Sequence, residues 1–325
     1  MTGTPPLLRV EHLSVRFAAR GAVDGQLRAL DDVSFEIAPG ETLGVVGESG
    51  CGKSTLARAL LRLVPVAAGR LVFDGRDYTF DDETTLRSLR RAVRLVFQDP
   101  LASLNPRFTI GQSVREPLEI FEPSLTRTDR DRAVAVALER VGLGSHFAQR
   151  YPHELSGGQN QRVSIARALI GEPRLLLCDE SVSALDVSVQ AQILNLLADL
   201  QRDTGVSILF ISHDLSVVRH ISHRLMVLYL GRVMEQGDAA TVFASPAHPY
   251  TRSLLDAVPI ADPVRERARA ARLAPLTGDL PSPLNPPSGC VFRTRCPLAS
   301  EQCRMVAPTL STRGATQFAC HHPQG

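Results

Sequence analysis

The 325-residue chain has no uninterrupted apolar run approaching the ~20 residues that a helix needs to cross a bilayer. Residues 1–6, Met-Thr-Gly-Thr-Pro-Pro, lack the charged stretch and apolar core of a secretory signal. The 36 basic and 34 acidic residues leave a formal net charge of +2, so the charge balance does not require nucleic acid as a partner. With 44% hydrophobic residues, the sequence predicts a globular cytoplasmic protein with one large core and a second, smaller unit.

Cysteine is scarce along most of the chain and concentrated near its end. Cys51 and Cys178 stand apart, and the other four form the cysteine segment, residues 290–320: Cys290, Cys296, Cys303 and Cys320. The reducing cytoplasm argues against structural disulfides. Four thiols in so short a segment could converge on one ion, because a small tail has difficulty ordering itself without one. The spacing C-x5-C-x6-C-x16-C differs from the C-x2-C pairs of zinc ribbons.

A complete G-x-x-x-x-G-K-[ST] motif occupies residues 47–54, called the phosphate loop below. In such a loop the glycines let backbone N–H groups curl around phosphates, Lys53 reaches the β- and γ-phosphates, and the Ser54 hydroxyl binds Mg²⁺. An apolar, strand-like run precedes the loop, and a helical pattern follows it. The motif therefore predicts a nucleoside triphosphate site. The expected nucleotide contacts are Gly47, Glu48, Ser49, Gly50, Cys51, Gly52, Lys53, Ser54 and Thr55.

A second apolar run begins at Leu175 and ends in two acids, Asp179 and Glu180. Nucleotide-binding sheets present carboxylates at the carboxyl ends of buried strands as partners for Mg²⁺. We expect Asp179 to hold the metal and Glu180 to polarise an attacking water as general base. Taken alone, the same pattern fits a strand that ends in a solvated acidic turn.

Ser156-Gly157-Gly158-Gln159, called the signature segment below, precedes a helical stretch from Val163 to Ile170. Two adjacent glycines before a helix expose its first N–H groups, which makes a second anion cradle. The alternative is a flexible turn followed by a helix capped by Ser156.

In this order and spacing, the phosphate loop, the signature segment and the Asp-Glu strand resemble the motifs of the ATP-binding cassette (ABC) family. Three further stretches match that family's motifs: Gln98-Asp99-Pro100, Ser183-Ala184-Leu185-Asp186 and Phe210-Ile211-Ser212-His213-Asp214. The resemblance implies an α/β fold, a P-loop NTPase (RecA-like) cassette with an antiparallel β subdomain and an inserted helical subdomain. The expected bounds are 1–258 for the nucleotide-binding domain, about 100–170 for the helical subdomain, and 259–325 for a small cysteine-rich C-terminal extension.

The resemblance also implies that two cassettes meet head to tail, with ATP between the phosphate loop of one and the signature segment of the other. Gln98 is expected to contact Mg²⁺ or the attacking water, and His213 the γ-phosphate. Asp186 is expected to lie across the dimer seam. Phe17 matches the aromatic residue that stacks on adenine, although an ordinary strand aromatic fits the same pattern. A lone histidine beside an apolar strand, such as His213, is more often structural.

Residues 98–117 and 248–252, together with the cysteine segment, are similar to the ABC branch that imports oligopeptides and dipeptides. In that branch, a tail of this kind carries a four-iron, four-sulfur cluster, for which four thiolates are the right complement. Zn²⁺ and unligated thiols stay open as alternatives, and His321 and His322 leave room for a mixed ligand set. The expected cofactors are therefore ATP, Mg²⁺ and a [4Fe-4S] cluster.

The expected function is ATP hydrolysis that drives peptide uptake. The partners implied are a second cassette (a copy of this chain or a paralogue), two transmembrane permease subunits and, through them, an extracytoplasmic solute-binding protein, with no nucleic acid. The expected location is peripheral, on the cytoplasmic side of the inner membrane. Two alternatives stay open: an importer of nickel or another small solute, and a soluble ABC ATPase that works without a permease. A non-catalytic role is disfavoured because Lys53, Asp179, Glu180 and His213 are all present.

Overall fold

The computed structural model describes residues 5–22, 25–258, 267 and 278–324. The chain divides into two compact units, each assembled from separate stretches of sequence. Unit 1 holds residues 1–8, 36–42 and 72–212, and unit 2 holds residues 9–35, 43–71 and 213–325. Across the described ranges, the helices are all too short or too polar to span a membrane.

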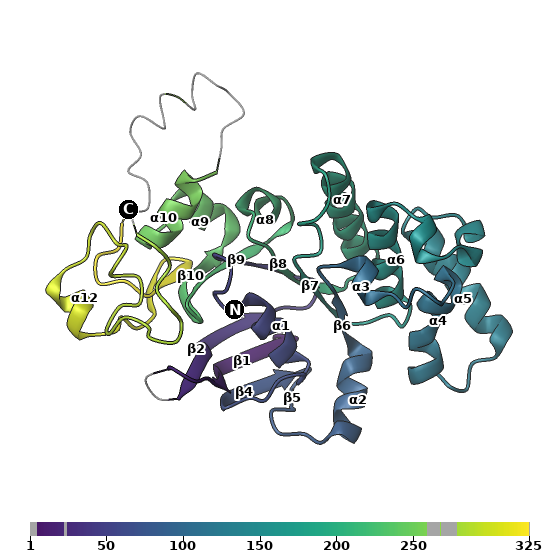
Figure 1. Ribbon diagram of the computed structural model, residues 1–325, viewed down its shortest axis with the longest axis horizontal. Coiled ribbons are helices and arrows are strands. Elements are labelled where there is room, and N and C mark those ends of the chain that lie inside the picture. The colour runs from purple at the N-terminus through teal and green to yellow at the C-terminus, as the bar shows by residue number, and fades with distance from the viewer. Residues whose placement is uncertain (1–4, 23–24, 259–266, 268–277, 325) are drawn as a thin grey trace. The chain divides into compact units, whose positions relative to one another are not determined.

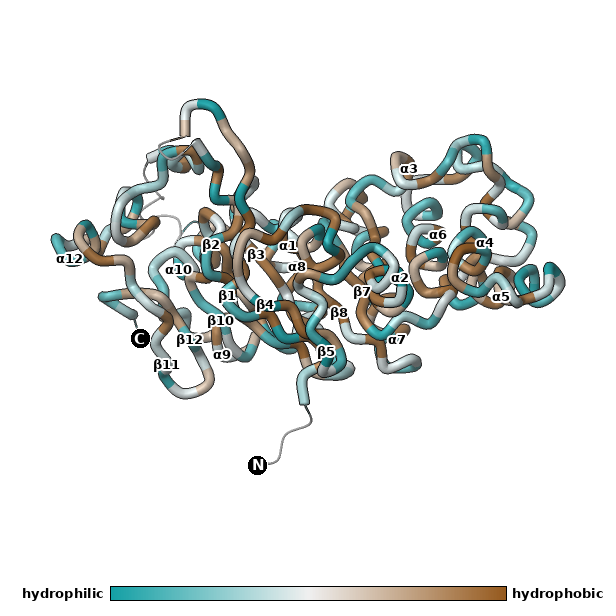
Figure 2. The backbone as a smooth tube through the Cα atoms, turned by 90° about the horizontal axis from the view of Figure 1, so that it is seen from below, coloured by the Kyte–Doolittle hydropathy of each residue, from teal (hydrophilic) through white to brown (hydrophobic). Residues whose placement is uncertain are grey.

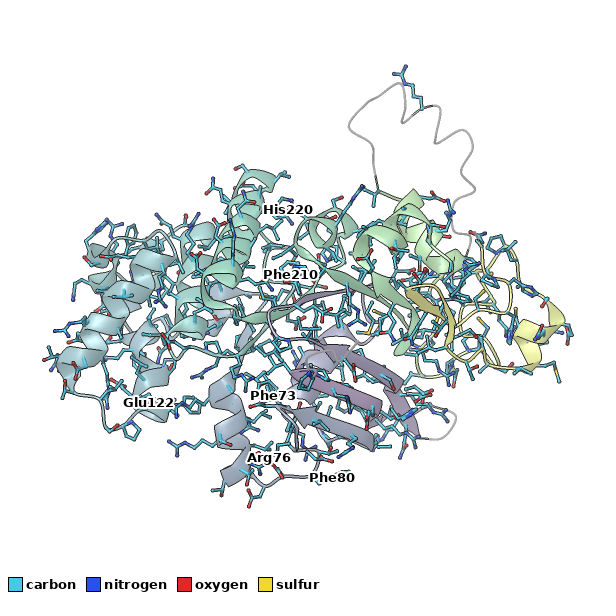
Figure 3. All side chains as sticks on the ribbon, turned by 180° about the vertical axis from the view of Figure 1, so that it is seen from behind. Phe73, Arg76, Phe80, Glu122, Phe210 and His220 are labelled. Carbon is cyan, nitrogen blue, oxygen red and sulfur yellow. The ribbon has the colours of Figure 1, made fainter. Side chains whose placement is uncertain are left out.

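Three parallel strands form the sheet of unit 1: β6 (Val93–Val96), β7 (Leu175–Asp179) and β8 (Ser207–Ile211). Every residue of β7 and β8 is buried, as expected for parallel strands covered on both faces. This burial explains why the strands are nearly continuous apolar runs, and the tube in Figure 2 is brown along β7. Phe210 of β8, labelled in Figure 3, is fully buried.

Between β6 and β7 the chain is helical. Side-chain caps set the starts of the three longest helices of this stretch: Thr109, Thr126 and Ser156 each accept a hydrogen bond from a backbone N–H in the first turn. These helices pack on one another within unit 1 (Figure 1). The elements are α3 (Pro100–Ser103), α4 (Ile110–Phe121), α5 (Arg127–Arg140), the 3₁₀ turns η1 (Ser145–Gln149) and η2 (Pro152–Glu154), and α6 (Gly157–Leu169).

The remaining elements of unit 1 precede β6 or follow β7 along the chain. β5 (Arg76–Asp77) pairs antiparallel with the last residues of β4 (Ala68–Phe73), opposite Val72 and Phe73. Helix α2 (Glu83–Ala92) is capped by Asp82, and α7 (Val187–Thr204) is capped by Asp186 and ends at Gly205, which has a left-handed backbone. A glycine at this position is a common helix stop, because only glycine adopts that conformation at low cost.

Unit 2 contains most of three strands that pair in the order β2 (Gln26–Ile37), β1 (Leu8–Ala18), β4 (Ala68–Phe73). It also holds a set of strands in the order β11 (Ser311–Arg313), β12 (Thr316–Phe318), β10 (Arg232–Asp238), β9 (Arg224–Tyr229), β3 (Thr42–Val46). β3 and β9 are parallel, and the other pairs of this set are antiparallel. Its helices are α1 (Lys53–Leu60), α8 (Leu215–Ile221), α9 (Ala239–Ala244), α10 (Pro249–Asp256) and α12 (Glu301–Met305).

The described part of the C-terminal region is built onto unit 2. β12 pairs with β10 through the register Glu235 opposite Phe318, and the yellow segment that carries α12 lies beside β10 in Figure 1. The predicted boundary between residues 1–258 and 259–325 stays a prediction, because residues 259–266 and 268–277 lie outside the described ranges.

His248 is the N-cap of α10, and its Nδ1 accepts a hydrogen bond from the Tyr250 amide at 3.0 Å. The Glu235 carboxylate accepts hydrogen bonds from the amides of Ala247 and His248, at 2.7 and 2.9 Å. The imidazole is almost completely buried, and burial lowers the pKa of His248 to about 3. The ring is therefore neutral in the folded protein.

We expect His248 to make stability depend on pH in acid. Its folded-state pKa lies below the unfolded value of about 6.5, so the unfolded chain binds more protons between about pH 6.5 and 3. Stability therefore falls as the pH drops through this window, by about 2 kcal/mol at pH 5 from this group. His248→Asn keeps a capping oxygen and removes the titration. Urea unfolding at pH 7.5 and pH 5 should show the smaller loss of stability in the variant, and equal losses would contradict the assignment.

Candidate nucleotide site

The phosphate loop lies between β3 and α1 in unit 2, and neighbouring backbone leaves no room for side chains at two of its glycines. A Cβ at Gly47 would lie 2.2 Å from the Leu228 carbonyl oxygen. A Cβ at Gly52 would lie 2.4 Å from the carbonyl oxygen of Ala29, and Gly52 has a left-handed backbone with φ of 106°. Both positions therefore require glycine, and the loop takes its shape from the strands packed against it.

Lys53 directs its ammonium group into this loop. Its Nζ donates hydrogen bonds to the carbonyl oxygens of Gly47 and Glu48, at 2.7 and 3.0 Å, and the side chain is 4% exposed. Lys53 also begins α1, whose N-cap Gly52 supplies no side-chain cap. A lysine ammonium and a helix N-terminus both attract anions, so the loop is built to receive phosphate groups.

Glu48 of the phosphate loop is hydrogen-bonded to two residues that the motif did not indicate. Arg295 Nη1 donates to both carboxylate oxygens of Glu48, at 2.7 and 2.9 Å. The Glu48 amide donates to the Tyr250 hydroxyl at 3.0 Å. Tyr250 belongs to the stretch 248–252 and Arg295 directly precedes Cys296, but neither pattern indicates a partner in the phosphate loop.

Phe17 and His213 also belong to unit 2. Phe17 lies near the end of β1 and is half-buried, and His213 is exposed, just before the Asp214 cap of α8. Adenine stacking by Phe17 and γ-phosphate contact by His213 stay predictions.

In unit 1, the carboxyl ends of β6 and β7 bring Gln98, Asp179 and Glu180 together. Gln98 Nε2 donates to Glu180 Oε2 at 3.2 Å, and Asp179 is 8% exposed. Glu180 has a left-handed backbone with φ of 48°, and its amide donates to the Ile211 carbonyl at 3.0 Å. Such a conformation is uncommon for a residue with a side chain, and residues of this kind cluster at functional sites. An amide and two carboxylates at one sheet edge suit a Mg²⁺ and water site.

The signature segment begins α6 with a reciprocal capping box. Ser156 Oγ accepts from the Gln159 amide at 3.3 Å, and Gln159 Oε1 accepts from the Ser156 amide at 2.9 Å. A Cβ at Gly158 would lie 2.5 Å from Val189 Cγ1, so the starts of α6 and α7 approach closely. Asp186 caps α7, and hydrogen bonds from Ser188 and from the Val189 amide lower its pKa. The predicted cap at Ser156 and the glycine-led helix start are therefore both present.

Within the cysteine segment, Cys290 and Cys303 are joined through the backbone, and the other three thiols affect the pKa of Cys320. The Cys290 amide donates to the Cys303 carbonyl at 2.8 Å. Burial raises the pKa of Cys320 to about 11, and the charges of Cys296, Cys290 and Cys303 add to the rise. Across the described ranges, however, no group of three or more His, Cys, Asp or Glu side chains is arranged to hold a metal ion. The predicted metal site at Cys290, Cys296, Cys303 and Cys320 therefore gains no support from the structure.

Three features together define a nucleotide-binding cassette. They are the phosphate loop between a strand and a helix, the acid pair after a buried parallel strand, and the helix that starts with two glycines. Residues 30–183 match the family described as ABC transporter. Residues 234–303 match the one described as Oligopeptide/dipeptide transporter, C-terminal region.

The chain is 50% identical over 321 residues to the Oligopeptide transport ATP-binding protein OppF of Haemophilus influenzae, covering 97% of this chain and 96% of that protein. It is 55% identical over 285 residues to OppF of Salmonella typhimurium, covering 87% and 84%. The chain belongs to the ABC transporter family, in the branch of the oligopeptide transport ATP-binding proteins, and it is an ATPase of that family.

Solved structures confirm the predicted fold class. The cassette MJ0796, in a dimeric post-hydrolysis state bound to ADP and Pi, has a TM-score of 0.65 and 29% identity, covering 71% of this chain and 98% of that one. CbiO1 from Clostridium perfringens, part of the ABC transporter complex CbiONQ, has a TM-score of 0.66 and 31% identity, covering 74% and 92%. The P-loop NTPase cassette, with α/β content and mixed sheets, is therefore confirmed.

Two substitutions separate ATP binding from hydrolysis. Glu180→Gln should retain ATP binding and slow hydrolysis by about 10²–10⁴-fold, because the amide is not a general base. Lys53→Ala should weaken binding itself by about 10–100-fold, because a charge-assisted hydrogen bond to phosphate is lost. ATP titration and steady-state turnover measure the two effects. Glu172→Gln, an exposed position of the same unit as Glu180, is the matched control, and near-normal turnover of Glu180→Gln would exclude it as the base.

Proposed function

We propose that this chain is the ATP-hydrolysing subunit of a membrane importer for oligopeptides or dipeptides. The proposal rests on one observation: the identity to OppF proteins extends over nearly the whole chain, including a region that matches the C-terminal region of oligopeptide/dipeptide transporters. The cassette alone is shared by transporters of many solutes, whereas the match at residues 234–303 is to a region described for oligopeptide and dipeptide transporters.

In the proposed reaction, each ATP lies between two cassettes. The phosphate loop of one holds the triphosphate through Lys53 and its backbone amides, and the signature segment of the other presents its helix start to the γ-phosphate. Ser54, Asp179 and Gln98 would hold Mg²⁺, which compensates phosphate charge. Glu180 accepts a proton from the attacking water while Gln98 and His213 orient the reacting groups. Such transfer depends mainly on positioning and charge compensation, and the dimeric MJ0796 cassette supports the pairing.

The proposed partners follow from the same branch. The second cassette is a copy of this chain or a paralogue, and two transmembrane permease subunits receive the movement that ATP binding and hydrolysis produce. A solute-binding protein outside the membrane delivers the peptide. We therefore propose that the chain is a peripheral protein on the cytoplasmic side of the inner membrane.

Uptake in cells tests the transported solute. A strain that lacks this chain should lose uptake of a radiolabelled tripeptide, and wild-type protein should restore it whereas Lys53→Ala should not. Uptake of radioactive nickel, measured in the same strains, should be unaffected. Loss of nickel uptake with normal tripeptide uptake would contradict the peptide proposal. Failure to co-purify with any membrane permease after mild detergent extraction would favour a soluble ABC ATPase.

We further propose that the four thiols of the cysteine segment bind one [4Fe-4S] cluster. The proposal is supported by the number and closeness in sequence of the four cysteines, two of which are tied together by the hydrogen bond from the Cys290 amide to the Cys303 carbonyl. Tetrahedral zinc would hold four sulfurs about 3.8 Å apart, given Zn–S bonds of about 2.3 Å. A four-iron cluster takes one thiolate on each of its four irons, which matches the four cysteines of this segment. It would supply a fixed scaffold for the segment.

Anaerobic purification tests the cluster. Full-length protein should contain iron and inorganic sulfide in about equal amounts, with the brown absorption of iron–sulfur proteins. Cys303→Ser should lose both, whereas Cys178→Ser, a buried thiol of β7, should keep them. Zinc at one equivalent without sulfide, or protein free of iron and sulfide, would overturn the proposal.

A further inference from the structure

Arg295 links the cysteine segment to the phosphate loop within unit 2. Its side chain is 9% exposed and the side chain of Glu48 is 27% exposed, so the pair is largely shielded from water. One guanidinium nitrogen bonds both carboxylate oxygens, at 2.7 and 2.9 Å. Shielded charge pairs of this kind are costly to break from one side, because the remaining charge is left without a partner.

An aromatic cluster fixes where Arg295 can lie. The rings of Tyr229, Tyr250 and Phe292 are packed with centroids 4.7 to 5.4 Å apart. The Arg295 amide donates to the Phe292 carbonyl at 3.0 Å, so the turn that carries the guanidinium is tied to a fully buried ring. Because Tyr250 also accepts a hydrogen bond from the Glu48 amide, the backbone and the side chain of Glu48 are held by one cluster.

The charge of this pair matters because Glu48 is part of a loop that receives a triphosphate. A carboxylate without a partner in that loop would repel the phosphates through a poorly solvated environment, where charge interactions are strong. Burial acts to lower the pKa of Arg295, but the interactions with Tyr229 and the Glu48 carboxylate outweigh it and leave the pKa raised. The guanidinium therefore keeps its charge, and it compensates the charge of the Glu48 carboxylate that it contacts.

We propose that Arg295 is a positioning residue for ATP binding: it neutralises Glu48 and holds it in place, so that the phosphate loop is ready for the triphosphate. The C-terminal segment is thus a structural part of the nucleotide site. This inference rests on the assignment of the phosphate loop as the ATP site. It assigns no contact between Arg295 and ATP.

The test compares ATP binding and turnover in Arg295→Ala, Arg295→Lys, Glu48→Gln and the double variant Glu48→Gln/Arg295→Ala. Arg295→Ala should raise the ATP dissociation constant and KM about tenfold, with little change in kcat, because the reacting groups are untouched. Arg295→Lys should recover part of the loss. The double variant should bind ATP better than Arg295→Ala, since it no longer leaves a carboxylate unpaired in the loop.

Arg293→Ala is the matched control, because Arg293 lies in the same segment and its Nε donates to the Ser288 carbonyl at 2.8 Å, within that segment. It should bind ATP as the wild type does. An unchanged KM in Arg295→Ala would overturn the inference, and so would a double variant as weak as Arg295→Ala. If Arg295→Ala fails to fold, the ATP dissociation constants of Arg295→Lys and of the double variant Glu48→Gln/Arg295→Lys are compared instead. The double variant should again bind ATP more tightly than the single one.

Lys53→Ala distinguishes failure of this inference from failure of the site assignment. If Lys53→Ala binds ATP as tightly as the wild type, the phosphate loop is not the ATP site. If Lys53→Ala loses binding and Arg295→Ala keeps it, the loop assignment stands and the role of Arg295 alone is wrong.

Discussion

The backbone packing at Gly47 and Gly52 is the constraint on which the rest of the site depends. The Leu228 carbonyl and the Ala29 carbonyl lie where side chains at these two positions would be, so the loop has one shape that fits. That shape places the Lys53 ammonium against the loop carbonyls and starts α1 with its N–H groups directed at the same place. A loop whose form is fixed before ATP arrives loses little conformational entropy on binding.

The positions of the other candidate site residues follow from where strands end and where helices begin. Parallel strands leave their carboxyl ends at one edge, which brings Gln98 to 3.2 Å from the Glu180 carboxylate although the two are far apart in sequence. The helix starts at Ser156 and Asp186 are each capped by their own side chain, which keeps both starts well formed. The sheet edge and the two helix starts are therefore ordinary elements of an α/β protein, and the ATPase chemistry proposed for them would come from the residues at their ends.

The features that the sequence predicted correctly are local ones. The cap at Ser156, which the sequence offered as the alternative to an anion cradle, involves residues three apart. The phosphate loop is one continuous motif, and β7 appears as an apolar run because it is buried on both faces. The Arg295 to Glu48 pair spans 247 positions, and no local pattern encodes such a contact. Likewise, the spacing of the four cysteines shows that they are close in sequence, but the geometry of their sulfurs depends on tertiary packing. The pairing of β12 with β10 was also beyond local pattern, because β12 has only three residues and its partner lies some 80 positions earlier in the chain.

We propose that one chain carries half of each ATP site. The most direct measurement is a cryo-EM structure of the Glu180→Gln protein with ATP and Mg²⁺, in complex with its permease subunits and the second cassette. The account predicts that the triphosphate lies on the Gly47 to Ser54 loop of one cassette and faces a Ser-Gly-Gly-Gln helix start of the other. A nucleotide enclosed by one cassette alone, with Ser156 to Gln159 facing solvent, would contradict it.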